Sequence, residues 1–166
     1  MKKAIAAMLP LLVLCSCPFS SPVPLTDPRE SLIDASLAGA WSWVKKEGSS
    51  AEEGEVLFLV FNEHEYYIEL NSVERGTPKK DRYRGFVSVF DDVRILNVRN
   101  LRGNEGFYFL RYAIAGDSLR MSFVSDTHLK EKISSSGELS AAFRRHLGEK
   151  DFFEDETLFT RNTAKP

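Results

Sequence analysis

Cysteine is scarce in this chain of 166 residues: the two that it has, Cys15 and Cys17, both lie near its N-terminus. Residues 18–166 therefore cannot be held by an internal disulfide or a cysteine-rich metal site, and their stability must come from packing. Positive charge is not in excess either, since the formal net charge is −2. Because nucleic-acid-binding domains carry basic patches, we expect no nucleic-acid partner.

Sequence signatures of catalysis are also lacking. The chain has no Gly-x-Ser-x-Gly nucleophile elbow and no glycine-rich phosphate-binding loop. His64 lies between Glu63 and Glu65, but no second imidazole is close in sequence, so a solvated hairpin tip is the better interpretation. His128 and His146 are interpreted as surface or packing residues. We therefore expect no catalytic residue, no metal and no cofactor, although a triad could still assemble from distant residues.

The N-terminus carries the features of a bacterial lipoprotein signal. Residues 4–14 form an apolar run after two lysines, as in a secretion signal, and this run is too short to span a bilayer comfortably. It ends in Leu14-Cys15-Ser16-Cys17, which resembles the bacterial lipobox. The resemblance implies cleavage before Cys17, diacylglycerol on its thiol, and a fatty acid such as palmitate on the new amino group. The alternative is ordinary secretion with cleavage near Ser16.

Residue 18 is proline rather than the aspartate that keeps lipoproteins at the inner membrane in the enterobacterial sorting pattern. The resemblance therefore implies a lipid anchor in the bacterial outer membrane. Four prolines between residues 18 and 28 favour an extended backbone, so we expect residues 17–28 to form a semi-rigid tether. The expected organisation is a signal peptide at 1–16, this tether, and one folded domain at 29–166.

Alternation of apolar and polar residues predicts a mainly β domain. Strands are expected from Ala40 onward and then over 56–61, 64–70, 83–90, 93–99, 107–115, 119–124 and 158–161, about eight in all. The continuous apolar run at 56–61 is expected to be well buried. Short turns such as Gly116-Asp117 predict antiparallel hairpins in an up-and-down order. Closing this meander into a barrel would remove both exposed edges.

Two helices are expected at the ends of the domain. Asp27 and Pro28 form a favourable helix start, and Gly39 would end a short N-terminal helix. A capping box at Ser135 predicts a second helix over about 137–147, just before the last strand.

The order of these elements resembles the lipocalin and lipocalin-like pattern, in which a Gly-x-Trp on the first strand packs beneath an arginine near the chain end. Gly39-Ala40-Trp41 and Phe159-Thr160-Arg161 match it over about 28–161. The resemblance thus implies that Trp41 fills the base of the barrel under Arg161. The second lipocalin motif, Thr-Asp-Tyr, is missing, and a helix before the last strand suits lipocalin-like bacterial domains better. The alternative is another antiparallel fold, such as a β-sandwich.

Six aromatic residues on the expected strands could line an apolar pocket or fill a closed core: Phe58, Tyr66, Phe86, Phe107, Phe109 and Phe123. An eight-stranded barrel is just wide enough for either outcome. An open pocket predicts a membrane-anchored envelope lipoprotein that binds or carries a small apolar or amphipathic ligand such as a lipid. A closed core predicts a non-catalytic structural or interaction module of the envelope, with an envelope protein as its partner.

Overall fold

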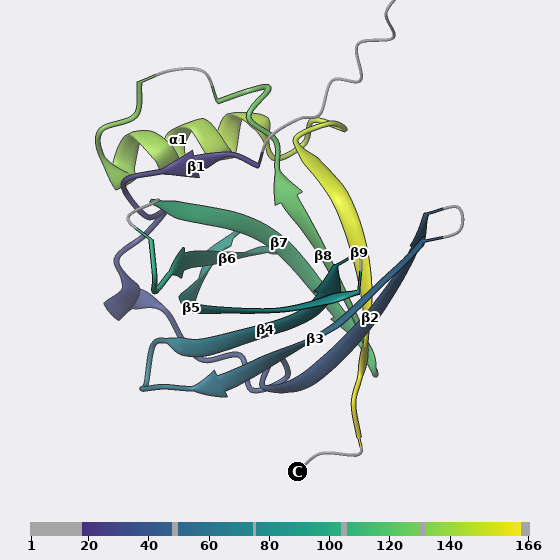
Figure 1. Cartoon of the computed structure of the whole chain (residues 1–166). Helices are drawn as coiled ribbons and strands as arrows, with labels where there is room; N and C mark the ends of the chain where they lie inside the picture. The colour runs from purple at the N-terminus through teal and green to yellow at the C-terminus, as the bar shows by residue number, and fades with distance from the viewer. Residues whose placement is uncertain (1–17, 48–49, 75, 104–105, 130–131, 164–166) are drawn as a thin grey trace, which may run out of the picture.

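The computed structural model describes residues 18–47, 50–74, 76–103, 106–129 and 132–163, with only the backbone described for 45–47, 50–51 and 74. Its centre is a closed antiparallel barrel (Figure 1). The barrel strands are β2 (Gly39–Glu47), β3 (Ser50–Val60), β4 (Tyr66–Glu74), β5 (Thr77–Phe90), β6 (Val93–Asn100), β7 (Phe107–Ala115), β8 (Ser118–Val124) and β9 (Phe153–Arg161). The predicted mainly β class and up-and-down strand order are confirmed.

The barrel closes because its first and last long strands pair with each other. β2 pairs with β3 on one side and with β9 on the other, and β9 also pairs with β8. In the β2–β9 register Trp41 lies directly opposite Arg161. Directly opposed residues of an antiparallel pair share a face of the sheet. Closure therefore brings these two side chains together.

The proline-rich N-terminal segment is part of the fold. Its short strand β1 (Ser20–Ser21) pairs with the start of β7. One residue earlier, Phe19 N donates to Val124 O at 2.8 Å, so the segment bridges β7 and β8 where they diverge. Phe19 and Leu25 are buried. The expectation of a tether over 17–28 is therefore wrong for residues 18–28, because these apolar side chains pack on the barrel.

The short N-terminal helix expected after Asp27 is not formed. Asp27 does act as a cap, since its carboxylate accepts from Arg29 N, but only the 3-10 turn η1 (Pro28–Glu30) follows. Residues 31–38 are irregular. Ser31 Oγ accepts from Val87 N of β5 at 3.0 Å. In this segment, hydrogen bonding to the barrel thus takes the place of the backbone hydrogen bonds that a helix would have made.

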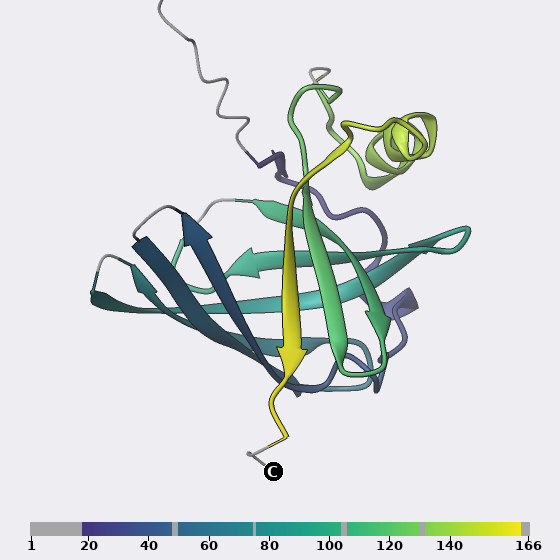
Figure 2. The same cartoon turned by 90° about the vertical axis from the view of Figure 1, so that its right-hand side faces the viewer.

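The predicted second helix is present as α1 (Ser136–His146), which lies outside the barrel beside β1 (Figures 1 and 2). Its start is capped by Ser135, whose Oγ accepts from Glu138 N at 3.2 Å. Its buried residues pack with the N-terminal segment and the outer faces of β5 to β8 in a second core, which includes Phe19, Leu25, Phe90, Ile95, Phe109, Leu139 and Phe143. In the described part of the chain no helix is long and apolar enough to cross a membrane.

The strand over 56–61 is not buried along its whole length, contrary to expectation. Val56 and Phe58 face the interior and are almost fully buried, but Leu59, Val60 and Phe61 are 47%, 54% and 55% exposed. The reason is that this part of the barrel wall is covered on one face only, as is common in antiparallel sheets.

Candidate functional site

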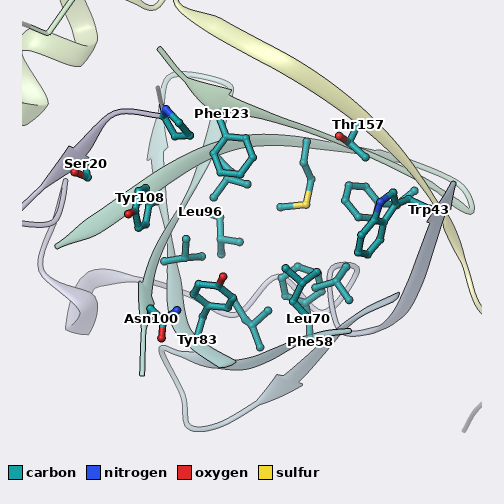
Figure 3. Close-up of a pocket in the computed structure, with 17 residues that line it drawn as sticks. Ser20, Trp43, Phe58, Leu70, Tyr83, Leu96, Asn100, Tyr108, Phe123 and Thr157 are labelled. Atoms are coloured by element: carbon teal, nitrogen blue, oxygen red, sulfur yellow. The ribbon is translucent and has the colours of Figure 1, made fainter. Parts of the chain in front are cut away.

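The interior of the barrel holds a cavity of about 600 Å³. Every barrel strand contributes a side chain to its wall, and Figure 3 shows these side chains converging on one space. The wall is mainly apolar and includes Val56, Phe58, Leu96, Leu110 and Met121. No charged side chain is among the described lining residues. This space suits the uncharged part of a ligand, because an unpaired charge would be costly to bury there.

One end of the barrel is closed by Trp41. Its indole is fully buried, and Nε1 donates to Leu37 O at 2.9 Å. The Arg161 guanidinium lies over the indole, with Cζ 4.1 Å from the ring centroid. The backbone oxygens of Ser36 and Ala38 accept from this guanidinium at 2.6 and 3.1 Å. A guanidinium over an indole face is a favourable cation–π contact, and here it covers the barrel base.

Gly39 makes room for this arrangement. Its φ of +118° is a backbone conformation that residues with a Cβ rarely adopt. A Cβ at this position would also lie 3.2 Å from Arg161 Nη1. The structure therefore brings Gly39, Trp41 and Arg161 together at the base of the barrel.

Asp34 holds the irregular segment before β2 against the closed end. The Tyr112 hydroxyl donates to its carboxylate at 2.9 Å, and the Tyr66 hydroxyl donates to its backbone oxygen at 3.0 Å. Arg94 lies 3.5 Å from the same carboxylate. Partial burial opposes ionisation of Asp34, but hydrogen bonds from Ser36 and Tyr112 outweigh it and lower the pKa of Asp34. Burial raises the pKa of Tyr66 to about 12, so its hydroxyl remains a donor at neutral pH.

Replacing Asp34 with asparagine is expected to destabilise the protein by about 1–2 kcal/mol at pH 7, because hydrogen bonds to a charged group are lost or weakened. The pKa of Asp34 is lower in the folded than in the unfolded chain. The stabilisation that the ionised Asp34 carboxylate contributes is therefore complete above the pKa of about 4 that it has in the unfolded chain. This stabilisation is lost as the pH falls through the lower pKa of the folded chain. Urea unfolding from pH 7 to pH 2 measures this. A stability difference between wild type and Asp34→Asn that is constant with pH would contradict it.

The other end of the cavity is its mouth. Asn100 ends β6, Tyr108 is the second residue of β7, and Tyr83 lies opposite Asn100 on β5; these three residues give the rim hydroxyl and amide groups (Figure 3). Pro18 and Ser20 of the N-terminal segment line the cavity too. The rim is thus more polar than the interior. This arrangement suits an amphipathic ligand, which has one polar end and one apolar end. Cys17, the expected lipidation site, lies outside the described residues.

Trp43 forms one wall of the cavity, and its ring centroid lies 5.4 Å from that of Phe159. The indole occupies space that only a glycine leaves free on β3. A Cβ on Gly54 would fall 2.1 Å from a Trp43 ring atom. Trp41 and Trp43 are two residues apart on β2, so alternation puts them on the same face, but Trp43 was not predicted as a lining residue.

Of the six aromatic pocket candidates, Phe58 and Phe123 line the cavity. Tyr66 also belongs to the core inside the barrel, but its hydroxyl is engaged with Asp34 at the closed end and it is not part of the cavity wall.

The other three candidates, Phe86, Phe107 and Phe109, do not line the cavity, and that expectation was wrong. Phe86 packs on Phe107 with ring centroids 6.3 Å apart, and Phe109 packs on Phe143 of α1 at 5.4 Å. The inward positions are taken by their strand neighbours, such as Tyr108. These phenylalanines instead hold the outer layer to the barrel.

Comparison with known proteins does not assign a family. No family model matches the chain. No curated protein shows significant sequence similarity to it. A solved structure of a de novo designed fluorescence-activating β-barrel is similar at a TM-score of 0.43 and 14% identity, over 79% of this chain and 100% of the designed one. Function must therefore be inferred from the cavity itself.

Proposed function

We propose that this chain is a lipid-anchored protein of the bacterial outer membrane whose lipocalin-like barrel binds a small apolar or amphipathic ligand, such as a lipid. The observation that carries the proposal is the apolar cavity of about 600 Å³, with Trp41 closing the barrel at one end. Ligand cavities are commonly about 300–1,000 Å³ and mostly apolar, with a few polar groups. The protein would act by binding, without catalysis.

The character of the wall suggests how such a ligand would lie. Its hydrocarbon part would enter among Phe58, Leu96 and Leu110, and its polar head would remain at the rim near Tyr83 and Asn100. Each methylene group removed from water contributes about 0.8 kcal/mol, which corresponds to about a fourfold gain in affinity. Affinity should therefore depend on the length of the hydrocarbon.

The place of the expected anchor supports exchange of ligand with a membrane. Pro18 lines the cavity, and Cys17 is the residue directly before it in the sequence. A lipid on Cys17 would therefore hold the barrel close to the membrane surface. We infer that this closeness lets an apolar ligand pass between membrane and cavity with little exposure to water.

A fluorescent fatty acid, displaced by unlabelled fatty acids of increasing length, tests this function. We expect one ligand per chain and a fourfold gain in affinity per methylene until the cavity is filled. Beyond that length the affinity should level off. Absence of binding at micromolar protein, or an affinity that does not change with chain length, would rule out the proposed function.

The alternative, a structural or interaction module with a barrel filled by its own side chains, is less well supported. It requires a solid interior, whereas the interior contains a cavity lined from every barrel strand.

A further inference from the structure

Two histidines and a glutamate meet outside the barrel, on residues that do not line the cavity. His128 follows β8, His146 is the last residue of α1, and Glu149 lies between α1 and β9. His128 Nδ1 is 2.7 Å from Glu149 Oε2, and His146 Nδ1 is 2.9 Å from Oε1 of the same carboxylate. The three potential ligand atoms all lie within 4.8 Å of one another. The segment after β8 and the C-terminal end of α1, with the turn that follows it, thus present ligand atoms at one point.

We propose that His128, His146 and Glu149 form a binding site for a divalent transition-metal ion of the Zn²⁺ class. Imidazole nitrogen and carboxylate oxygen bind Zn²⁺ at about 2.0–2.2 Å. Because imidazole suits Zn²⁺ better than Mg²⁺ or Ca²⁺, the donor set favours a transition metal. Three protein ligands leave the fourth tetrahedral position to water. The site is independent of the ligand-binding function proposed for the cavity.

Asp151 supports the site as a hydrogen-bond partner of a ligand. Its Oδ1 lies 3.0 Å from Nε2 of His128. With an ion bound, Nε2–H of His128 would donate to Asp151, and Nδ1 would be left without a proton to bind the metal. Metal-bound histidines commonly donate their other N–H to a carboxylate, which fixes the tautomer and the ring orientation. The carboxylates of Glu149 and Asp151 also balance the two positive charges of the ion.

Packing holds both imidazoles in position. The Phe152 side chain is fully buried, and its ring centroid lies 6.1 Å from that of His128 and 6.0 Å from that of His146. The two imidazole centroids are 5.4 Å apart. Preorganised ligands lose little conformational freedom on binding. An ion at this point would tie the end of α1 to the connections on both sides of the helix.

Zinc titration tests the site, using the full chain without a histidine tag and with Cys15 and Cys17 replaced by serine so that no thiolate competes. We expect one Zn²⁺ per chain and a rise in Tm of about 5–10 °C at a hundredfold excess over Kd, reversed by a chelator. His128→Ala and His146→Ala should abolish this binding. Asp151→Asn should weaken it by about 10–100-fold, as is typical of outer-sphere partners.

His64→Ala is the matched control, because the third histidine of the chain lies between β3 and β4 and hydrogen bonds with Ser31 O instead. It should bind Zn²⁺ with wild-type affinity. The Asp151 side chain is 65% exposed, so Asp151→Asn should keep the fold and separate loss of metal from loss of structure. Absence of saturable binding at micromolar Zn²⁺, or equal binding by the His128→Ala/His146→Ala double variant, would overturn the proposal.

Discussion

Trp41→Ala is expected to lower the free energy of unfolding by about 3–5 kcal/mol, the range found when a fully buried aromatic side chain is removed. The Trp41 side chain has no exposed surface, and its Nε1 donates to Leu37 O. Truncation would leave a void at the base of the barrel. It would also remove the aromatic face over which the Arg161 guanidinium lies.

Urea denaturation followed by far-UV circular dichroism measures this loss. Trp43→Ala is the matched control, since Trp43 lies on the same strand and the same side but borders the cavity. Removing the Trp43 indole enlarges an existing cavity, so Trp43→Ala should lower the free energy of unfolding by less than Trp41→Ala does. A Trp41→Ala variant as stable as the wild type, or no less stable than Trp43→Ala, would show that Trp41 does not hold the base of the barrel.

Leu110→Trp is expected to abolish or strongly reduce binding of the fluorescent fatty acid while the barrel remains folded. Leu110 lines the cavity from β7, so an indole at this position would occupy space that the ligand needs. Overpacking a filled core costs about 1–3 kcal/mol, but here the added volume enters a cavity and the cost should be lower. Equilibrium titration measures the affinity, and thermal unfolding verifies the fold.

Leu158→Trp makes the same chemical change on the outer surface. Leu158 is 56% exposed on β9, so a larger side chain there would extend into solvent. Affinity should remain at the wild-type level in this variant. Equal loss of binding in both variants, or retained binding in Leu110→Trp, would place the ligand outside the barrel.

The barrel itself could be predicted because three features of the sequence indicate the same fold. They are the alternation of apolar and polar residues, the short turns between the expected strands, and the matching residues at the two ends of the domain. Gly39 and Trp41 stand at the start of the first long strand and Arg161 at the end of the last. Closure of β2 against β9 places Trp41 and Arg161 opposite each other. The N-terminal segment was not predictable in this way, because its prolines favour an extended chain whether or not it is docked. The structure shows that it is docked, since β1 pairs with β7 and Phe19 and Leu25 are buried.

The cavity wall was predicted only in part, and the reason lies in the layer outside the barrel. On β7 the outward Phe109 alternates with the inward Leu110, and both are apolar because α1 covers the outer face. Period-two alternation cannot tell inside from outside on a strand that is covered on both faces. The same ambiguity affects Phe86 and its inward neighbour Val87 on β5.

The histidine cluster could not be predicted from spacing. His128 and His146 are separated in the chain by most of the α1 helix and the connection before it. They meet because the helix folds back along the outer surface, where both rings pack on Phe152. A metal site assembled from such distant positions leaves no local sequence motif.

Methyl NMR during titration with a fatty acid is the most direct test of the proposed binding inside the barrel. Val56, Val98 and Leu110 line the cavity, whereas Val44, Val89 and Leu158 are 60%, 57% and 56% exposed. We predict that the methyl signals of the first three shift in a saturable way with one ligand per chain, while those of the last three stay unchanged. Shifts confined to the exposed methyl groups, or no shift at saturating ligand, would contradict ligand binding in the cavity.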